Sequence, residues 1–443
     1  MAKKKQIELT IEEKLQNALV PKEEQPYKIP SNWCWTYIHN IAIVVTGKTP
    51  SKKNKEYYGG KFPFFKPADL DAGRNMQYAT EYLSEKGKSI SVIIPEKATG
   101  ICCIGTIGKC GYFLVEGTTN QQINTVISKI NPLYSYYFFN TNSFVRELIF
   151  KASATTIAIV NKSKLESCLF PVAPLNEQQR IVNIIESLFV KLDRAKELIE
   201  NTFAQFEQNK MAILHKAFTG ELTVKWRKEN NIDLSSWKKC ELKEVFKVVK
   251  DKYNPQTENQ IVNYIGLENI ETSKGIISKS NSSEVKSIKT KFKKDDVLYG
   301  KLRPYLNKHD VVNFDGICST DILVFRFNDI NTAKYINYYF NLPMFIQYAV
   351  ENSSGINLPR VSEKTISKYK ISLPTIEEQQ EIVNILDNLL AKYNKIKNLE
   401  QQLEKIELLK KAILAKAFRG ELGTNNPDEE SAENLLKEIL AEK

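Results

Sequence analysis

Cysteine and histidine are scarce in this 443-residue sequence and show none of the patterns of a metal or disulfide site. The seven cysteines form no Cys-x-x-Cys pair, and the three histidines lie far apart along the chain. An odd number of cysteines without metal-ligand spacing favours buried, reduced thiols. We therefore expect no structural zinc site and no disulfide framework.

Long apolar runs are also missing. No stretch approaches the roughly 18 consecutive apolar residues that a membrane-spanning helix needs. Glu8, Glu12 and Glu13 follow the basic N-terminus, where a secretory signal would be apolar. These two absences lead us to expect a cytoplasmic protein.

Recognisable catalytic motifs are absent as well. The run from Gly105 to Cys110 does not have the spacing of a phosphate-binding loop. Residues 131–134 read NPLY and lack the second proline of the loop with which DNA amino-methyltransferases hold a base. With three scattered histidines, no set of nucleophile, base and orienting residue can be assembled. No catalytic site can therefore be assigned from the residues alone.

Positive charge, by contrast, is in excess. The formal net charge is +11, and the segment from Thr424 onward carries −4, which leaves +15 on the preceding residues. A basic body of this kind suits a polyanionic partner, with nucleic acid the leading candidate. A basic protein without such a partner is the alternative that charge alone leaves open.

The chain contains an internal repeat of about 200 residues. Residues 177–184 read EQQRIVNI and residues 378–385 read EQQEIVNI. Residues 212–222 (AILHKAFTGEL) and 412–422 (AILAKAFRGEL) match at nine of eleven positions. Two such blocks, repeated in the same order, indicate a tandem duplication.

A long amphipathic helix is predicted between the two blocks of each copy. Apolar residues recur there at steps of three and four, which is the pattern of a heptad seam. Thr375 with Glu378 is a capping-box pattern at the start of the second helix, and Gly220 and Gly420 suit left-handed C-terminal caps. The two helices should pair as an antiparallel coiled coil; the alternative is that each packs only on its own domain. The residues expected at this interface are Ile181, Ile185, Leu188, Leu192 and Ile199 in the first helix and Leu386, Leu389, Ile396 and Leu403 in the second.

The segment before each helix is repeated more loosely. Trp33 resembles Trp237, and Gly105 falls near Gly300. Short β-rich runs between glycine-containing turns indicate mixed α and β domains, so the fold class is α+β. The expected parts are an N-terminal helical extension (1–25), a first variable domain (26–175), a central long helix (176–221), a linker (222–236), a second variable domain (237–374), a C-terminal long helix (375–422) and an acidic tail (423–443).

Polar and basic clusters in the two domains are the candidate binding sites. Lysines and hydroxyls can hold phosphates, Asn and Gln can pair with adenine, and Arg with guanine. Solvated loops and turn hydrogen bonds are the alternative roles for the same residues. The candidates are Lys48, Thr49, Lys52, Lys53, Asn120, Gln121, Gln122 and Asn124 in the first domain, and Lys301, Arg303, Tyr305 and Asn307 in the second.

These features together resemble a known family. Two variable domains, each followed by a Glu-Gln-Gln-x-Ile-Val helix that ends in Lys-Ala-Phe-x-Gly-Glu-Leu, look like the specificity subunit of type I restriction–modification systems. The runs 30–35 (PSNWCW), 47–50 (GKTP) and 120–124 (NQQIN) are similar to the family's first target-recognition domain. The resemblance covers residues 20 to 422, but the second domain has Cys318-Ser-Thr-Asp-Ile322 in place of the amide motif.

The resemblance implies a non-catalytic subunit that reads a bipartite double-stranded DNA site through two different domains. It implies two DNA methyltransferase subunits and a nuclease–translocase subunit as partners, and no membrane. No cofactor would be bound by this chain, because AdoMet, ATP and Mg²⁺ would belong to the partners. The alternatives are the recognition partner of a related methylating nuclease and a coiled-coil scaffold without sequence-specific binding.

Overall fold

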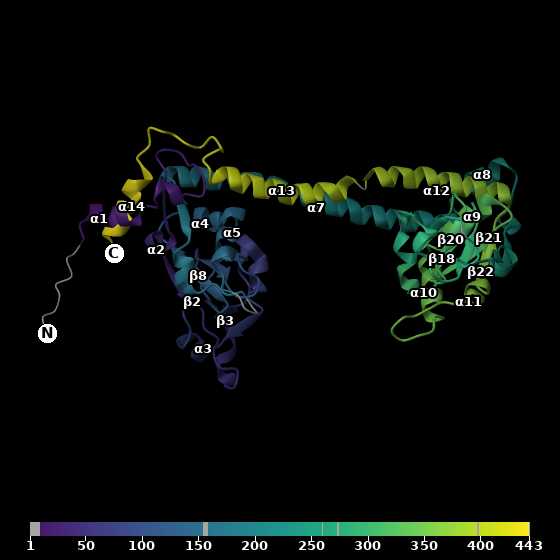
Figure 1. Cartoon of the computed structure of the whole chain (residues 1–443), viewed down its shortest axis with the longest axis horizontal. Coiled ribbons are helices and arrows are strands. Elements are labelled where there is room, and N and C mark those ends of the chain that lie inside the picture. The colour runs from purple at the N-terminus through teal and green to yellow at the C-terminus, as the bar shows by residue number, and fades with distance from the viewer. Residues whose placement is uncertain (1–8, 154–157, 259, 273, 397, 443) are drawn as a thin grey trace. The chain divides into compact units, whose positions relative to one another are not determined.

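The chain forms two compact units. The computed structural model describes residues 9–153, 158–258, 260–272, 274–396 and 398–442, without the side chains of 284, 390 and 392–401. The first unit comprises the residues up to 198 together with 401–443, and the second comprises 199–400. Each unit therefore combines one globular domain with a stretch of each long helix (Figure 1).

The domain of the first unit is built from small sheets packed against short helices. Its sheets have the strand orders β2-β8-β5-β6, β4-β3-β7 and β1-β9. The strands are β1 (Cys34–Tyr37), β2 (Ala42–Thr46), β3 (Tyr58–Phe65), β4 (Glu81–Leu83), β5 (Thr99–Cys102), β6 (Cys110–Tyr112), β7 (Thr118–Thr119), β8 (Ile123–Ser128) and β9 (Leu169–Val172). The helices are α1 (Ile11–Ala18), α2 (Ile38–Ile41), α3 (Glu85–Ser89), α4 (Pro132–Phe139), α5 (Asn142–Lys151), α6 (Lys162–Glu166) and α14 (Ala432–Ala441).

The domain of the second unit repeats part of this framework. Its sheets have the orders β11-β21-β18-β19, β12-β17-β20-β13-β16, β10-β22 and β14-β15. The strands are β10 (Lys238–Glu241), β11 (Lys247–Val248), β12 (Lys252–Tyr253), β13 (Asn263–Ile265), β14 (Ile270–Glu271), β15 (Gly275–Ile276), β16 (Ser280–Asn281), β17 (Lys289–Phe292), β18 (Val297–Gly300), β19 (His309–Val311), β20 (Gly316–Cys318), β21 (Ile322–Arg326) and β22 (Lys370–Leu373). The helices are α8 (Val224–Glu229), α9 (Ile330–Tyr339), α10 (Pro343–Glu351) and α11 (Glu363–Ser367).

The shared framework confirms the predicted duplication of a mixed α/β domain. The sheet β2-β8-β5-β6 corresponds to β11-β21-β18-β19, and the pair β1-β9 corresponds to β10-β22 in strand order and register. Both cores are rich in aromatic side chains. Tyr134 and Phe138 are buried in the first, and Tyr299 and Phe325 in the second.

The predicted long helices are present. The first is α7 (Leu175–Thr219), and the second is formed by α12 (Ile376–Ile396) and α13 (Asn398–Ala417). Gly220 and Gly420, which follow the helix ends, have φ of +81° and +73°, as a left-handed cap requires.

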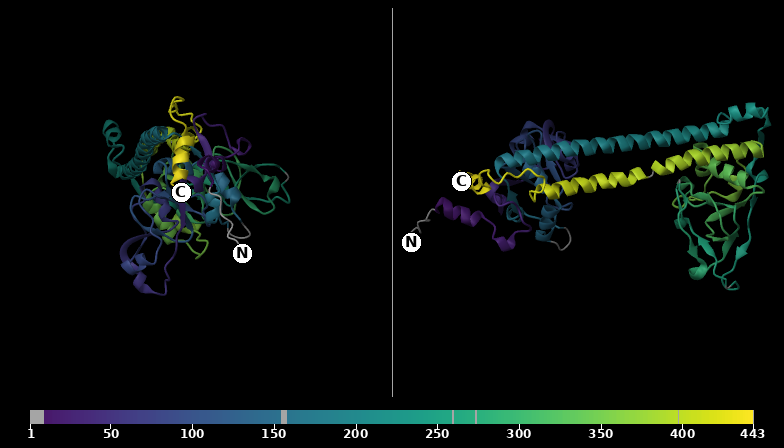
Figure 2. Two further views of the ribbon diagram at one scale, coloured as in Figure 1. Left: turned by 90° about the vertical axis from the view of Figure 1, so that its left-hand side faces the viewer. Right: turned by 90° about the horizontal axis from the view of Figure 1, so that it is seen from above.

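Within each unit the two helices run antiparallel. In the first unit, Lys196 pairs with Glu407 at 3.2 Å and Lys410 pairs with Asp193, so the two sequences advance in opposite directions. Figure 2 shows α13 beside α7 there. In the second unit, Thr223, just after α7, donates a hydrogen bond to Glu378 in the first turn of α12. The predicted antiparallel pairing is confirmed within each unit.

The residues predicted at the helix interface divide into three groups. Fully buried members lie in the domain cores, where helix–helix and helix–domain packing merge: Ile181, Ile185 and Leu386. Half-buried members lie farther along the helices: Leu188, Leu192, Ile199, Leu389 and Leu403. The side chain of Ile396 lies outside the described residues. The helices thus pack both on each other and on their own domains.

A buried glutamate anchors the start of each long helix. In the first unit, Glu177 is fully buried and accepts hydrogen bonds from Trp33 Nε1 at 2.8 Å, Asn425 Nδ2 at 2.9 Å and Thr424 Oγ1 at 3.1 Å. The tryptophan opens the globular domain, and Thr424 and Asn425 follow the other long helix. One carboxylate therefore joins three parts of the chain that lie far apart in sequence.

The second unit builds the same anchor with a cation. Glu378 accepts from Trp237 Nε1 at 2.8 Å, from Thr223 Oγ1 at 2.6 Å and from Arg227 NH1 at 2.5 Å. Arg227 lies on α8 and also donates to the carbonyl of Gly220. The segment 222–236, predicted as a linker, thus carries a helix and a buried ion pair.

The capping box predicted at Thr375 is only half formed. Thr375 Oγ1 accepts from Glu378 N at 3.4 Å, but the glutamate side chain is taken up by the buried anchor. The terminal segments are ordered where the structure describes them. Thr10 and Glu13 form a complete capping box at the start of α1, and α14, in the acidic tail, packs on α1 and α2 (Figure 1).

Removing the charge of each anchor should affect the two units unequally. Glu378→Gln leaves the buried Arg227 without a counter-ion and should cost about 3–5 kcal/mol of unfolding free energy. Glu177→Gln removes an acceptor among neutral donors and should cost about 1–3 kcal/mol. Urea unfolding followed by hydrogen exchange, which reports on each unit, measures both. Equal losses would contradict the role given to Arg227.

Candidate nucleic-acid interface

Two candidate segments of the first domain meet at one end of its main sheet. Strand β2 pairs with β8, with Thr46 opposite Asn124, so the loop after β2 lies beside residues 119–124. Lys48 N donates to Thr119 O at 2.9 Å, and a Cβ on Gly47 would lie 2.2 Å from the carbonyl oxygen of Asn120. Glycine is therefore required for this close approach.

Polar side chains line this junction. Thr49 Oγ1 donates to Gln121 Oε1 at 2.5 Å, which leaves the amide nitrogen of the exposed Gln121 free of hydrogen bonds within the part of the chain that the structure describes. Lys48, Lys52 and Lys53 are exposed on the same loop. The sequence-predicted lysines, Thr49 and Gln121 are thus brought to one surface.

The remaining amides of this motif serve the fold. Asn120 is buried, and its Nδ2 donates to Gln122 Oε1 at 2.9 Å. Asn124 is also buried; it accepts from Thr46 Oγ1 at 2.7 Å and donates to Val160 O at 3.4 Å. Both asparagines fix the loop on which Gln121 sits.

The second domain presents a different loop at the corresponding place. Backbone hydrogen bonds fix the correspondence: Cys103 N donates to Gln122 O, and Lys301 N donates to Asp321 O. Leu302 bridges Arg360 as Ile104 bridges Ile159. The sequence comparison had set Gly105 near Gly300, but its structural counterpart is Arg303, the residue after Leu302.

The loop from Arg303 to Asn307 has an uncommon backbone. Arg303 and Asn307 have φ of +52° and +40° and flank the one-turn helix η8 (Pro304–Leu306). Left-handed conformations are uncommon for side chains of this size and cluster at functional sites. Here they leave Arg303 and Tyr305 exposed, Tyr305 by 53%.

Other side chains hold that loop in place. Asn307 is buried, and its Nδ2 donates to Phe340 O and to His309 Nε2, both at 3.1 Å. His309 Nδ1 in turn donates to Asn337 Oδ1 at 2.7 Å. Burial lowers the pKa of His309 to about 4, so the imidazole is neutral at pH 7. Asn307 thus supports the loop, and Lys301 is half-buried beside it.

Arg360 is a residue that the sequence analysis missed. It is exposed, and its Nε donates to Asp321 Oδ1 at 3.2 Å, beside the loop that carries Arg303. The scarcity of arginine could have drawn attention to it, because residues 237–374 contain only Arg303, Arg326 and Arg360. Arg326 is half-buried and held by two hydrogen bonds to the buried Asp296, whereas Arg303 and Arg360 are exposed.

Neither a metal site nor a membrane span is found in the described part of the chain. No three His, Cys, Asp or Glu side chains there are grouped so that they could hold a metal ion. The seven cysteines are buried. No described helix is both long and apolar enough to cross a membrane.

Comparison with known proteins identifies the family of this chain. The family model described as the type I restriction modification DNA specificity domain matches residues 30–201 and again residues 235–408. The chain belongs to this family. It is therefore a DNA specificity subunit of a type I restriction–modification system, with two target-recognition domains, and the non-catalytic part of that enzyme.

Curated relatives resemble this specificity subunit over most of its length. The EcoDI specificity subunit of Escherichia coli is 24% identical, with 94% of this chain and 96% of that protein covered. The MjaIX specificity subunit of Methanocaldococcus jannaschii is 25% identical, with 90% and 96% covered. The chain therefore aligns with these relatives over nearly their whole length.

Solved structures show the same fold. The HsdS subunit from Thermoanaerobacter tengcongensis aligns with a TM-score of 0.55 at 18% identity, covering 90% of this chain and all of that one. A structure solved to explain complex assembly and conformational transition of the type I restriction–modification system aligns with a TM-score of 0.68, with the same identity and coverage.

The buried histidine predicts a pH dependence of stability. In the unfolded chain His309 titrates near pH 6.5, and in the folded domain near 4, so the unfolded state binds more protons between these values. Stability of the second unit should fall by roughly 3 kcal/mol from pH 7 to pH 4 through this group. Urea unfolding of His309→Gln should lack that part of the slope. His215→Gln, at an exposed position, is the matched control and should keep it.

Proposed function

We propose that the two target-recognition domains of this chain read the two parts of a split double-stranded DNA site, each domain reading its own part. The observation that carries the proposal is the contrast at one corresponding position. The first domain presents the Thr49–Gln121 pair and has Gly105, without a side chain, at the position where the second domain presents Arg303. A glutamine amide can pair with adenine and a guanidinium with guanine, so the two surfaces suit different bases.

Phosphate contacts would come from the lysines around these residues. Lys48, Lys52 and Lys53 are exposed around Gln121. Such contacts position a protein on DNA without reading its sequence and make binding depend on salt. Asn120, Gln122, Asn124 and Asn307 act in this proposal through the loops that they hold.

Partner subunits would dock on the long helices. Val190 on α7 and Leu408 and Leu409 on α13 are apolar and at least half exposed in the first unit. Exposed apolar residues of this kind suit protein–protein contact. We place two methyltransferase subunits and a nuclease–translocase subunit among the partners, and AdoMet, ATP and Mg²⁺ on those partners. No observation favours a methylating nuclease's recognition partner or a scaffold without sequence preference.

Selection of binding sequences from random duplex DNA tests whether the chain reads a DNA site in two separate parts. At about 150 mM salt, the chain with its partners should enrich a gapped two-part sequence. Gln121→Ala and Arg303→Ala should each relax one base in a different part, at a cost of about 1–3 kcal/mol. Lys52→Ala is the control; it should weaken all sequences alike and reduce the salt slope by about 1. Relaxation of both parts by one variant would refute the division between the domains.

Assembly with the methyltransferase should depend on the helix seam. Leu188 and Leu192 are half-buried, one helical turn apart on α7, so Leu188→Asp with Leu192→Asp puts two carboxylates into an apolar contact. Co-purification with the methyltransferase should be lost. Ser187→Asp adds one such carboxylate at an exposed neighbouring position and should assemble normally. Retention of the partner by the leucine variant would count against docking on paired helices.

A further inference from the structure

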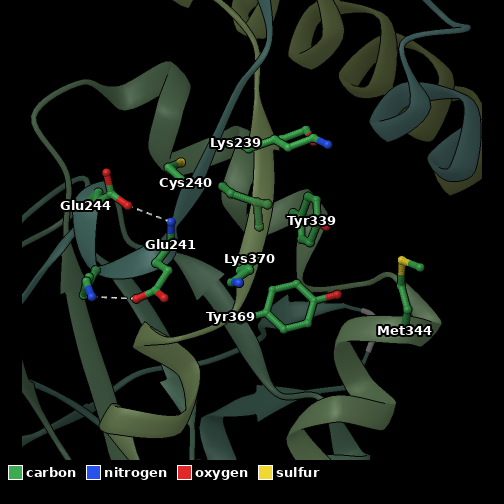
Figure 3. A pocket seen from close by; sticks show the side chains of 11 residues that line it. Lys239, Cys240, Glu241, Glu244, Tyr339, Met344, Tyr369 and Lys370 are labelled. Carbon is green, nitrogen blue, oxygen red and sulfur yellow. Dashed lines mark hydrogen bonds and ion pairs between the residues drawn. The ribbon is translucent and has the colours of Figure 1, made fainter.

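A pocket of about 670 Å³ opens on the second domain, beside the two-stranded sheet β10-β22. Its lining comes from both strands, from the turn η5 (Leu242–Glu244) and from α9 and α10. Figure 3 shows Tyr339, Tyr369 and Met344 projecting around the opening, with Lys239 above them. Met344 is 62% exposed, so an apolar side chain stands at the mouth.

The corresponding place in the first domain can be identified residue by residue. Trp35 lies opposite Pro171 in β1-β9, as Lys239 lies opposite Ser372 in β10-β22. Ile38 N donates to Cys168 O, and Leu242 N donates to Tyr369 O, each at 3.0 Å. The two strand pairs are therefore equivalent, and Trp35 occupies the position of Lys239.

In the first domain this strand edge is covered by the chain's own N-terminal segment. Val20 N donates to Trp35 O at 3.0 Å, and Thr36 Oγ1 donates to Ala18 O at 2.7 Å. Leu19 forms an antiparallel bridge with Thr36. A short extended segment thus adds to the free edge of β1, a mode by which sheets also bind peptides.

An aromatic side chain fills the place of the pocket there. The ring of Tyr27 packs edge-on against Trp35 at a centroid distance of 5.0 Å. Its hydroxyl lies near Ser143, the α5 residue that corresponds to Met344 of α10. Burial raises the pKa of Tyr27 to about 12, so the phenol is neutral. The equivalent space between Lys239 and Met344 is the open pocket.

No segment takes this role in the second domain among the residues that the structure describes. Strand β10 pairs on one side only, with β22. The carbonyl of Lys239 occupies the position of the Trp35 carbonyl, which accepts the hydrogen bond from Val20 N in the first domain. In the first domain α14 packs on α2, whereas η5, the counterpart of α2, lines the pocket. The same fold is therefore closed in one unit and open in the other.

The charges around the opening define the chemistry of an occupant. Lys239 and Lys370 lie on the two strands, and no carboxylate within the described ranges is at ion-pair distance from either. Glu241 is engaged by Lys243, and Glu244 by the backbone of Glu241. The opening thus presents two lysines that lie outside any ion pair within the described residues, around a space lined by two tyrosines and Met344. The segment that covers the first domain also combines glutamates with its tyrosine, at Glu23 and Glu24.

We propose that this pocket binds an extended segment of a partner protein, which pairs with the edge of β10, inserts an aromatic side chain between Lys239 and Met344, and carries acidic residues beside it. This site would act in protein–protein contact and is separate from the residues assigned to DNA reading. Its occupant is a peptide segment because the equivalent edge is filled by one.

Peptide display on the full-length chain tests the proposal. A library of random 16-residue peptides should yield peptides with Tyr, Phe or Trp next to Asp or Glu. A synthetic peptide of residues 18–29 of this chain should compete with them. Binding should weaken about tenfold on the variant Lys239→Glu with Lys370→Glu and on Met344→Asp, all at exposed or half-exposed positions. Lys286→Glu, an exposed lysine outside the pocket, is the matched control and should bind normally.

Several outcomes would overturn the proposal. These are no enriched peptide class, or peptides that bind the pocket variants as well as the control. A concentration-dependent dimer that is lost with Tyr27→Ala would assign the pocket to a second copy instead. A uniform loss of DNA affinity in the variant Lys239→Glu with Lys370→Glu would show that this surface contacts the DNA backbone instead. Failure of the DNA selection with intact peptide binding would refute the proposed DNA reading and leave this site standing.

Discussion

The rest of the molecule depends on a carboxylate buried at the start of each long helix. Glu177 and Glu378 are both fully buried, and each accepts three hydrogen bonds from side chains. A buried carboxylate is costly unless its oxygens are satisfied, so the donors must arrive together. They come from the first residues of the domain and from the segment after the other helix. The anchor therefore fixes where the domain begins, where its helix begins and where the other helix ends.

This anchor explains why the two helix ends are nearly identical while the domains are not. The glutamate needs its neighbours: Gln178 bonds to Ala173 O and Gln379 to Pro374 O, each at 2.8 Å, so the Glu-Gln-Gln run turns the chain from strand into helix. The surface loops do not have to supply these buried hydrogen bonds. Gly105 and Arg303 follow equivalent bridges, yet one has no side chain and the other presents a cation. A specificity subunit can thus change its reading surface while its framework stays fixed.

The two units differ in how the free edge of the equivalent strands β1 and β10 is covered. A free strand edge presents unpaired backbone groups, and proteins cover such edges or use them for binding. In the first unit, α1, the segment through Tyr27 and α14 enclose β1, and Arg180 holds Glu429 ahead of α14 with two hydrogen bonds of 2.7 Å. In the second, Arg227 of α8 is drawn to the anchor, and the edge of β10 stays open. Duplication gave one fold with unequal surfaces.

The sequence by itself determined the duplication, the long helices and their caps, and the family. Repeated blocks, apolar periodicity and glycine at the helix ends are local signals, and the physics behind them acts within a few turns of chain. The sequence also singled out Lys48, Thr49 and Gln121 as candidates, and the pairing of β2 with β8 makes them neighbours.

Only the tertiary structure decided the use of each polar side chain. Asn124 and Asn307 look like reading residues in the sequence, but packing buries them, and their amide nitrogens donate hydrogen bonds within the fold. Arg360 looks unremarkable there, yet a strand bridge carries it to Asp321. Glu378 reads as a capping residue, and its side chain instead meets Arg227 from a segment that resembles a linker. Burial and long-range hydrogen bonding depend on residues that lie about 40 to 250 positions apart. No local pattern contains that information, so the fold had to assign these roles.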